Sequence, residues 1–141
     1  MASVIMNVFK RDVFGGVISL SATNFYCSLM TSAISLSSTD QIRDATAWSQ
    51  LSACETSGTG YTTGGVLMSA LSVSADFTND RAIWDGGDLT WYDSTITAYG
   101  AIIRTSGTNT PCVYFDFGEN KSSQSGPFTI SWSSNGIIRG S

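Results

Sequence analysis

Apolar and polar residues alternate along most of the chain, the pattern of strands that bury one face. In residues 112–117, Val113, Phe115 and Phe117 fall on one face, and residues 128–133 repeat the alternation. Comparable patterns predict further strands at 13–21, 25–30, 66–75, 81–84, 89–92 and 97–104.

Turn-forming residues separate these strands. Residues 118–126, GENKSSQSG, are polar and bounded by glycines, which predicts a long hairpin loop. Residues 85–88, DGGD, predict a tight turn between two short strands. About seven or eight short strands with turns between them favour an all-β fold, a single-domain β-sandwich or jelly roll, over alternating βαβ units.

Two segments have helical spacing, so we expect one or two short helices beside the strands. Residues 4–14 fit a short amphipathic helix, and residues 39–52 fit a longer one. At the start of the second, Ser38 and Gln41 have the spacing of a capping box. Its apolar residues recur at helical intervals: Ile42, Ala45, Trp48 and Leu51.

Length and composition predict one folded domain over residues 1–141, with residues 1–14 as a short helix or an N-terminal arm. The chain is 42% hydrophobic and only 13% charged, so Ser, Thr, Asn and Gly must cover much of its surface. Such a surface suits packing against other protein, although β proteins also favour Ser and Thr in general.

Charge and hydropathy exclude several classes of protein. A formal net charge of −4 leaves no basic patch for nucleic acid and disfavours an anionic membrane. No apolar run approaches the roughly 18 residues of a membrane span, and the N-terminus lacks the pattern of a signal peptide. We therefore expect neither a nucleic-acid nor a membrane partner.

The sequence contains no histidine, which removes the commonest general base and metal ligand. A Ser-His-Asp triad and a Cys-His pair are therefore excluded. Cys27, Cys54 and Cys112 are widely spaced without a CxxC motif, so neither a redox dithiol nor a zinc knuckle is available. We expect three free thiols, synthesis in a reducing bacterial cytoplasm, no cofactor and no catalytic site.

Acidic residues gather in one segment, at Asp76, Asp80, Asp85 and Asp88. Their proximity to Trp84 and Trp91 is compatible with sugar binding, and a DGGD turn is compatible with calcium, although the ligand spacing of an EF-hand is absent. We favour a turn in which the Asp side chains bond to the backbone.

Residues 57–65, SGTGYTTGG, are the most glycine-rich stretch. A phosphate-binding P-loop needs a Lys after its last Gly, and a dinucleotide fingerprint needs different glycine spacing before a helix, so both fail. We predict a structural loop with positive φ angles or close backbone approach and Tyr61 as an aromatic plug. Its glycines are Gly58, Gly60, Gly64 and Gly65.

An ordered set of motifs runs through the chain: GYTTGG, WDGGDLTW, TITAYGAII, FDFG and FTISWSSNGII. This order resembles a family of small virion structural proteins of tailed bacteriophages. The resemblance covers roughly residues 7–138. The matching positions are Thr90-Trp91, Thr95 through Ala98, Ala101, Phe115 through Gly118, and Phe128 through Ile137.

The resemblance implies a non-enzymatic, all-β virion component. The role it favours is a head decoration (cement) protein that binds the shell of the major capsid protein, as a homotrimer. Phe9, Lys10 and Arg11 are the candidate arm for contact with the capsid. A tail, baseplate, fibre or connector protein stays open, as does a carbohydrate-binding module suggested by the aromatic residues near the Asp turn.

Overall fold

The computed structural model describes residues 2–34 and 42–140. Within these ranges, ten strands pair only in an antiparallel sense, and the α-helix α1 (Asn7–Phe14) accompanies them. The predicted all-β, sandwich-like fold is confirmed, with more strands than the sequence indicates. No helix in this part of the chain is long and apolar enough to cross a membrane.

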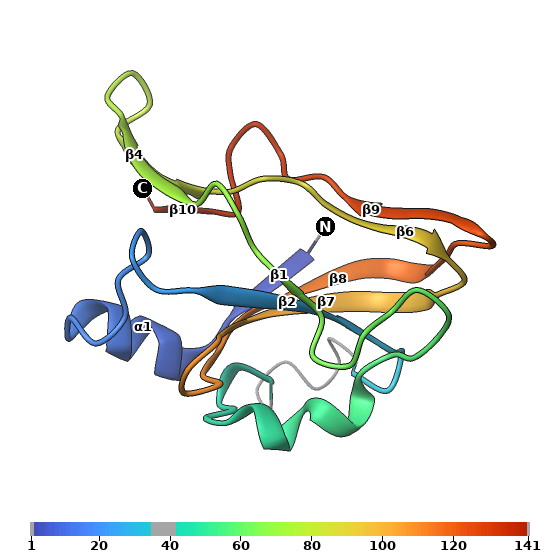
Figure 1. Ribbon diagram of the computed structural model, residues 1–141. Helices are drawn as coiled ribbons and strands as arrows, with labels where there is room; N and C mark the ends of the chain where they lie inside the picture. Colours follow the sequence, from blue (N-terminus) through green and yellow to red (C-terminus); the bar gives the residue numbers. More distant parts are fainter. Residues whose placement is uncertain (1, 35–41, 141) are drawn as a thin grey trace.

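A five-stranded sheet forms the lower layer in Figure 1, in the order β1-β8-β7-β2-β3. Its strands are β1 (Ala2–Ile5), β8 (Pro111–Ser122), β7 (Thr97–Thr105), β2 (Phe25–Met30) and β3 (Val66–Leu67). Strands β7 and β8 are the longest and lie at its centre, where β-branched and aromatic residues pack well on both faces.

Two smaller sheets share the upper layer (Figure 1). The strand orders are β10-β5-β4 and β6-β9. Their strands are β10 (Ile138–Gly140), β5 (Arg81–Asp85), β4 (Ser72–Asp76), β6 (Leu89–Ser94) and β9 (Gly126–Ile130). The tight turn predicted at residues 85–88 is not found: residues 86–88 form no turn and are instead the link by which the chain passes from β5 in one small sheet to β6 in the other.

Aromatic side chains fill the space between the layers. Trp84 of β5 packs on Phe25 of β2, with ring centroids 5.0 Å apart, and on Phe9 of α1 at 6.3 Å. Further along, the Phe115 and Trp132 ring centroids are 5.3 Å apart. Because each pair joins the two layers, the aromatic residues set how the layers are held together.

The large sheet is also covered on its other face. Residues 111–116 of β8 are all buried, not only the alternate ones. Tyr114, on the face opposite Phe115, donates a hydrogen bond from its hydroxyl to the Ile34 carbonyl at 3.2 Å. Helix α1 contacts β8, and the 3₁₀-helices η2 (Trp48–Gln50) and η3 (Ser52–Cys54) lie below the sheet in Figure 1.

Several predicted boundaries are wrong, each for a local reason. Residues 118–126 are not all loop, because β8 continues to Ser122 and pairs there with Thr97 of β7. Residues 13–21 form no strand, because α1 runs to Phe14 and turns follow it. The strand predicted at 66–75 is divided into β3 and β4.

The helix predicted over residues 39–52 is also corrected. Its first residues, with the capping-box pair Ser38 and Gln41, lie outside the described residues. Residues 42 and 43 are helical, but an irregular stretch follows them, and from Trp48 onward the chain forms the two 3₁₀-helices. The Gln50 side-chain oxygen accepts hydrogen bonds from the N–H groups of Thr46 (2.7 Å) and Ala47 (3.0 Å), which closes a tight turn in place of an α-helical one.

Candidate functional site

The glycine-rich loop, residues 57–65, connects the two layers. On the upper layer it bridges to Thr95, whose N–H donates to the Thr59 carbonyl at 2.9 Å. On the lower layer it lies against β2, where a Cβ placed on Gly65 would stand 1.9 Å from the Cys27 carbonyl oxygen. All four glycines of the loop have positive φ. The loop is therefore a backbone crossing that only glycine at position 65 permits.

Tyr61 fixes the middle of this loop. Its hydroxyl donates to Glu55 Oε1 at 2.6 Å and accepts from the Leu29 N–H at 3.0 Å. The same Glu55 oxygen accepts from the Gly64 N–H at 2.7 Å. Burial, together with the hydrogen bond to Glu55, raises the pKa of Tyr61 well above its usual range. The hydroxyl therefore stays protonated and acts as a fixed donor.

Removing this hydroxyl tests its role. Tyr61→Phe keeps the ring, which packs on Trp91 at 6.1 Å between centroids, but leaves the Leu29 N–H without its acceptor. We expect the free energy of unfolding to fall by about 1–3 kcal/mol. Urea denaturation gives the value, with Tyr92→Phe as the control, since Tyr92 is 74% exposed. Equal stability of the two variants would show that the hydroxyl does not hold the loop.

Arg104 completes the network around the loop, a role that no motif in the sequence indicates. Although it is only 6% exposed, its guanidinium donates to the Gly64 carbonyl at 2.8 Å and to the Ser28 hydroxyl. It also lies 4.5 Å from the centre of the Trp48 ring, a cation–π distance. Burial lowers the pKa of Arg104, and the negative charge of Glu55 opposes that shift.

This network has the properties of a structural clamp. No buried side-chain nitrogen or oxygen in residues 2–34 and 42–140 lacks a hydrogen-bond partner. Arg104 and Glu55 form hydrogen bonds with the backbone of Gly64, and Tyr61 forms them with the Leu29 N–H and with Glu55. They tie β2, β7 and the loop together.

The acidic residues predicted to cluster are separated by their partners. Asp76 pairs with Arg81 at 3.0 Å. Asp85 accepts from the Gly86 N–H at 2.9 Å, and Asp88 accepts from the Trp132 N–H at 3.1 Å. Among the described residues, no group of three or more Cys, Asp or Glu side chains is placed to hold a metal ion.

The aromatic residues beside these acids are not on the surface. Trp84 is 2% exposed and Trp91 6% exposed. The carbohydrate-binding alternative depended on exposed Trp and Tyr rings near the Asp turn. The expected exposure of Trp84 and Trp91 is wrong, whereas Tyr92 is exposed.

The candidate N-terminal arm is part of the folded domain. Strand β1 pairs with β8 from Ala2 to Ile5, and Phe9 is buried in the core. Lys10 and Arg11 are exposed on α1, where Arg11 Nε lies 2.7 Å from Asp12 Oδ1. Of the three residues predicted to contact the capsid, Lys10 and Arg11 are accessible to a partner and Phe9 is not.

Two of the three thiols are deeply buried. Cys27 and Cys112 are fully enclosed, whereas Cys54 is partly exposed. Burial raises the pKa of Cys27 from 9.0 to about 12, and burial also raises the pKa of Cys112. In the unfolded chain both thiols regain ordinary pKa values.

A pH dependence follows. The raised pKa of Cys27 means that stability is fully present below pH 9 and is lost as the pH rises toward 12. We expect the free energy of unfolding to fall by up to about 1.4 kcal/mol per pH unit for each such thiol. Urea titrations at several pH values measure this slope, and Cys27→Ala should reduce it. An unchanged slope in that variant would contradict the assignment to Cys27.

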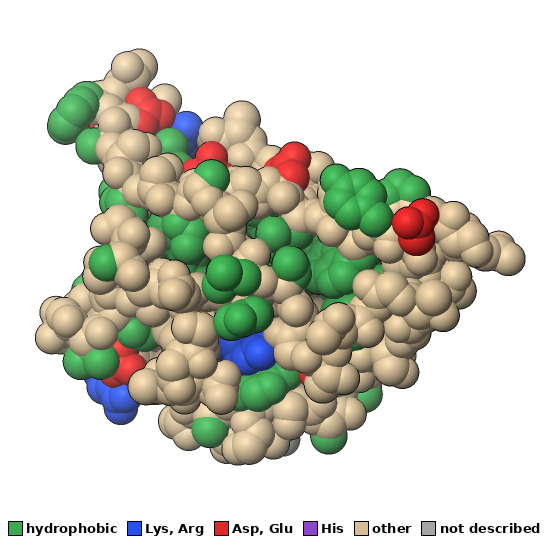
Figure 2. All heavy atoms as spheres, in the orientation of Figure 1, with side chains coloured by type: hydrophobic (Ala, Val, Ile, Leu, Met, Phe, Trp, Pro, Cys, Tyr) green, Lys and Arg blue, Asp and Glu red, His purple; other side chains and the backbone are tan. Residues whose placement is uncertain are grey.

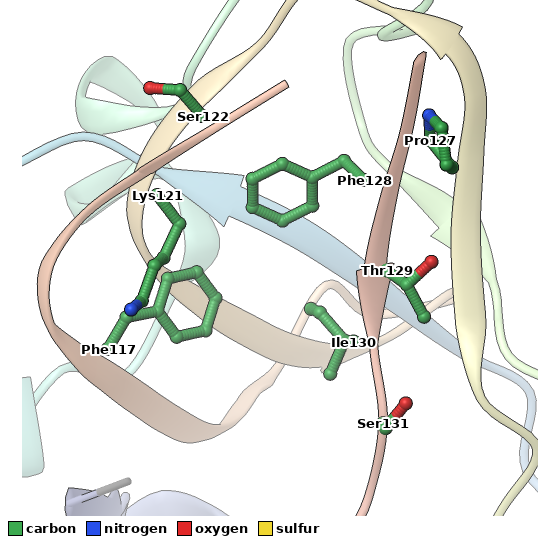
Figure 3. A pocket seen from close by; sticks show the side chains of 8 residues that line it. All are labelled: Phe117, Lys121, Ser122, Pro127, Phe128, Thr129, Ile130 and Ser131. Atoms are coloured by element: carbon green, nitrogen blue, oxygen red, sulfur yellow. The ribbon is translucent and has the colours of Figure 1, made fainter.

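Two grooves open along the edge between the layers. The larger, about 530 Å³, lies between β8 and β9, where Phe117, Phe128 and Ile130 point into it (Figure 3). The smaller, about 430 Å³, is bordered by β1 and by residues 132–139. Each is lined by one charged side chain, Lys121 or Arg139, and so neither brings an acid and a base together.

The exposed apolar residues lie elsewhere. Six large ones are exposed among residues 2–34 and 42–140: Phe14, Val17, Leu67, Val73, Phe77 and Tyr92. Figure 2 shows hydrophobic side chains at the projecting tip of the β4–β5 hairpin as well as in the middle of this face, between the layers. The hairpin is therefore a surface that offers apolar contact to a partner.

Comparisons with known proteins identify no relative. No family model matches the chain, and neither a curated protein nor a solved structure matches it significantly.

Proposed function

We propose that this protein is a non-enzymatic structural component of a tailed-phage virion, a head decoration protein that binds the shell of the major capsid protein. The resemblance of the ordered motifs to those of small phage structural proteins supports the virion assignment. Many of their apolar residues lie in the core: Trp91, Ile96, Ala98, Ala101, Phe115 and Phe128 are all buried. These apolar positions therefore serve the fold of the domain.

The observation that carries the proposal is that the polar network is used inside the domain, whereas the surface presents apolar side chains and open strand edges. Inside, Arg104, Glu55 and Tyr61 are committed to holding the glycine-rich loop. Outside, the described surface offers apolar side chains on a projecting hairpin and unpaired strand edges. A domain of this kind is suited to binding other protein, because both features are satisfied by an interface.

A decoration protein stabilises a shell by mass action. Binding that is available only on the expanded shell shifts the equilibrium toward that form. We expect a total interface of about 1,600 Å² per contact, with three copies grouped as a homotrimer between capsomers. Lys10 and Arg11, exposed on α1, are the basic residues placed for the acidic groups of a capsid partner.

Binding to isolated shells tests the proposal. Purified protein is mixed with expanded shells and with unexpanded precursor shells, both prepared without it, and is then sedimented. We expect saturable binding to the expanded shells only, and a higher melting temperature for those shells. Absence of binding to either would refute the head assignment, and binding to purified tails instead would favour the tail component.

A further inference from the structure

Strand β4 leaves one edge of the upper layer open. It pairs with β5 on one side and with no other strand of the described chain. Residues 72–75 are all exposed. Alternate N–H and C=O groups along this edge therefore point to solvent and can form a further ladder.

The other outer strands of the upper layer carry features that oppose such pairing. Strand β9 contains Pro127, which has no N–H to donate, and β10 contains the charged Arg139. Strand β6 has a register shift between Trp91 and Ser94. By contrast, β4 has no proline and no charge in residues 72–75, and its register with β5 is uninterrupted.

The sequence around β4 has a symmetric pattern. In residues 71–77, LSVSADF, every odd position is apolar and every even one polar. If a second copy of this strand pairs antiparallel about Ser74, Val73 of one copy lies opposite Ala75 of the other, and Ser72 lies opposite Asp76. No like charges face each other, and apolar side chains meet on one face.

We propose that β4 is a self-association edge, paired antiparallel with β4 of a second copy about a two-fold axis at Ser74. The two three-stranded sheets then form one continuous six-stranded sheet. An isologous contact of this kind uses the same surface on both copies, and the symmetric pattern of residues 71–77 fits that requirement.

The pairing also covers apolar surface that is otherwise left in water. Val73 is 51% exposed and Phe77 is 88% exposed. Val73 lies opposite Trp84 in the β4–β5 register, so its side chain is on the face that packs against the core. A second β4 extends this face and places apolar side chains beside Val73 and Phe77.

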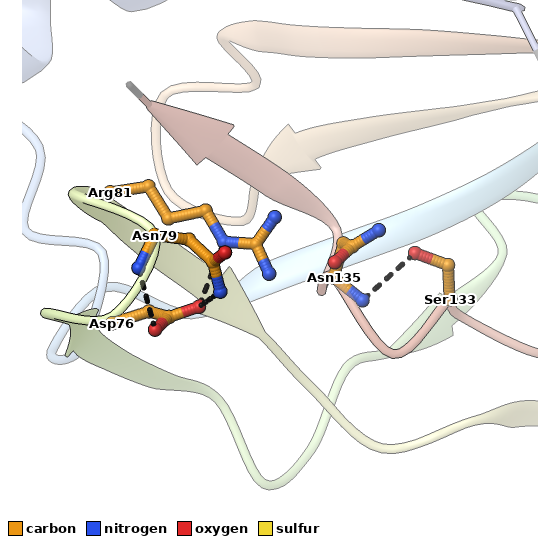
Figure 4. A network of polar contacts seen from close by, with 5 residues as sticks. All are labelled: Asp76, Asn79, Arg81, Ser133 and Asn135. Carbon is orange, nitrogen blue, oxygen red and sulfur yellow. Dashed lines mark hydrogen bonds and ion pairs between the residues drawn. The ribbon is translucent and has the colours of Figure 1, made fainter.

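The hairpin is ordered before any partner binds. Asp76 accepts from the Asn79 side-chain amide at 2.8 Å and from Arg81 at 3.0 Å, so the tip is held by its own side chains (Figure 4). Because the strand is already extended and paired with β5, little conformational entropy remains to be lost on association.

The small area sets the strength of the contact. An aromatic side chain such as that of Phe77 covers about 150–250 Å², and with a five-residue edge the total stays below the roughly 800 Å² per partner of a stable interface. Association is therefore reversible in dilute solution. It strengthens when copies are held close together, as on a virion surface. The contact itself does not depend on the proposed function, since it forms between isolated copies.

Charge placed at the two-fold axis tests the register. Ser74→Lys and Ser74→Glu each put like charges opposite each other in a homodimer, whereas an equimolar mixture puts opposite charges there. Ser74 is exposed, so both variants should keep the wild-type melting temperature. Ser134→Lys, at an exposed position outside any strand, is the matched control.

The readout is the weight-average mass by light scattering over a concentration series. At high concentration the wild type and Ser134→Lys should reach twice the mass of either Ser74 variant alone, and the mixture should return to the wild-type value. A wild-type mass that does not rise with concentration would overturn the proposal. A Ser74→Lys mass that rises like the wild type, or a mixture that stays at the lower mass, would overturn it as well. Because shells are absent, these outcomes are independent of the binding test above.

Discussion

Trp84→Ala is expected to lower the free energy of unfolding by about 3–5 kcal/mol, the range for removing a large aromatic side chain from a core. The side chain is 2% exposed and packs on Phe9 and Phe25. Its indole N–H also donates to the Leu20 carbonyl at 3.0 Å. Three separate segments therefore lose a common contact, and the carbonyl loses its donor.

Urea denaturation followed by circular dichroism measures this loss. Tyr92→Ala removes an aromatic side chain from a neighbouring strand, but Tyr92 is 74% exposed, so we expect a change within about 0.5 kcal/mol. If Trp84→Ala and Tyr92→Ala are equally stable, the layers do not pack through Trp84 as described.

Gly65→Ala is expected to destabilise the domain by at least about 4 kcal/mol, beyond the usual range for a single substitution. The residue has a φ of +80°, and the added Cβ would lie 1.9 Å from the Cys27 carbonyl oxygen and 2.8 Å from Ser28 Cα. Both neighbours belong to the backbone or Cα of β2, so no side-chain rotation relieves the clash. The loop must move away from β2, which also breaks the Arg104 bond to Gly64.

Gly107→Ala is the matched control, because nothing lies within 4 Å of an added Cβ there and its φ is outside the left-handed region. Its melting temperature should stay close to that of the wild type. A soluble Gly65→Ala protein with wild-type stability would contradict the close crossing of the loop over β2.

The strands that the sequence predicts best are those in the large sheet. Residues 25–30 and 97–104 are short, largely apolar runs, and they form β2 and β7. The far half of β8 was missed because residues 118–122 are polar, and their strand conformation comes from pairing with β7. Strand β1 was missed because the apolar residues near the N-terminus fit a helix as well as a strand.

The glycine-rich loop could be predicted because its glycine spacing excludes the phosphate-binding motifs and leaves a conformational role. The hydrogen-bond network that holds the loop could not be predicted. Arg104 bonds to Ser28 and Gly64, which are 76 and 40 residues away in sequence. A single Arg that ends an apolar strand looks like an exposed strand end, and only the three-dimensional fold shows that Trp48 covers it.

At the edge of β4, the sequence pattern predicts burial that the structure does not show. Its alternation was visible, but alternation predicts one buried face, whereas residues 72–75 are exposed on both. This contrast between pattern and exposure is the reason that we propose the strand as an interface. Side chains patterned for burial, on a strand that its own domain does not cover, are the expected mark of a partner.

The central claim, that the protein decorates a phage head, is tested most directly by its abundance in purified virions. On a stained gel, its band is measured against that of the major capsid protein. A decoration protein occupies repeated sites over the whole shell, so we predict a molar amount of the same order as the major capsid protein. A trace amount, fitting a few copies per particle, would contradict the account.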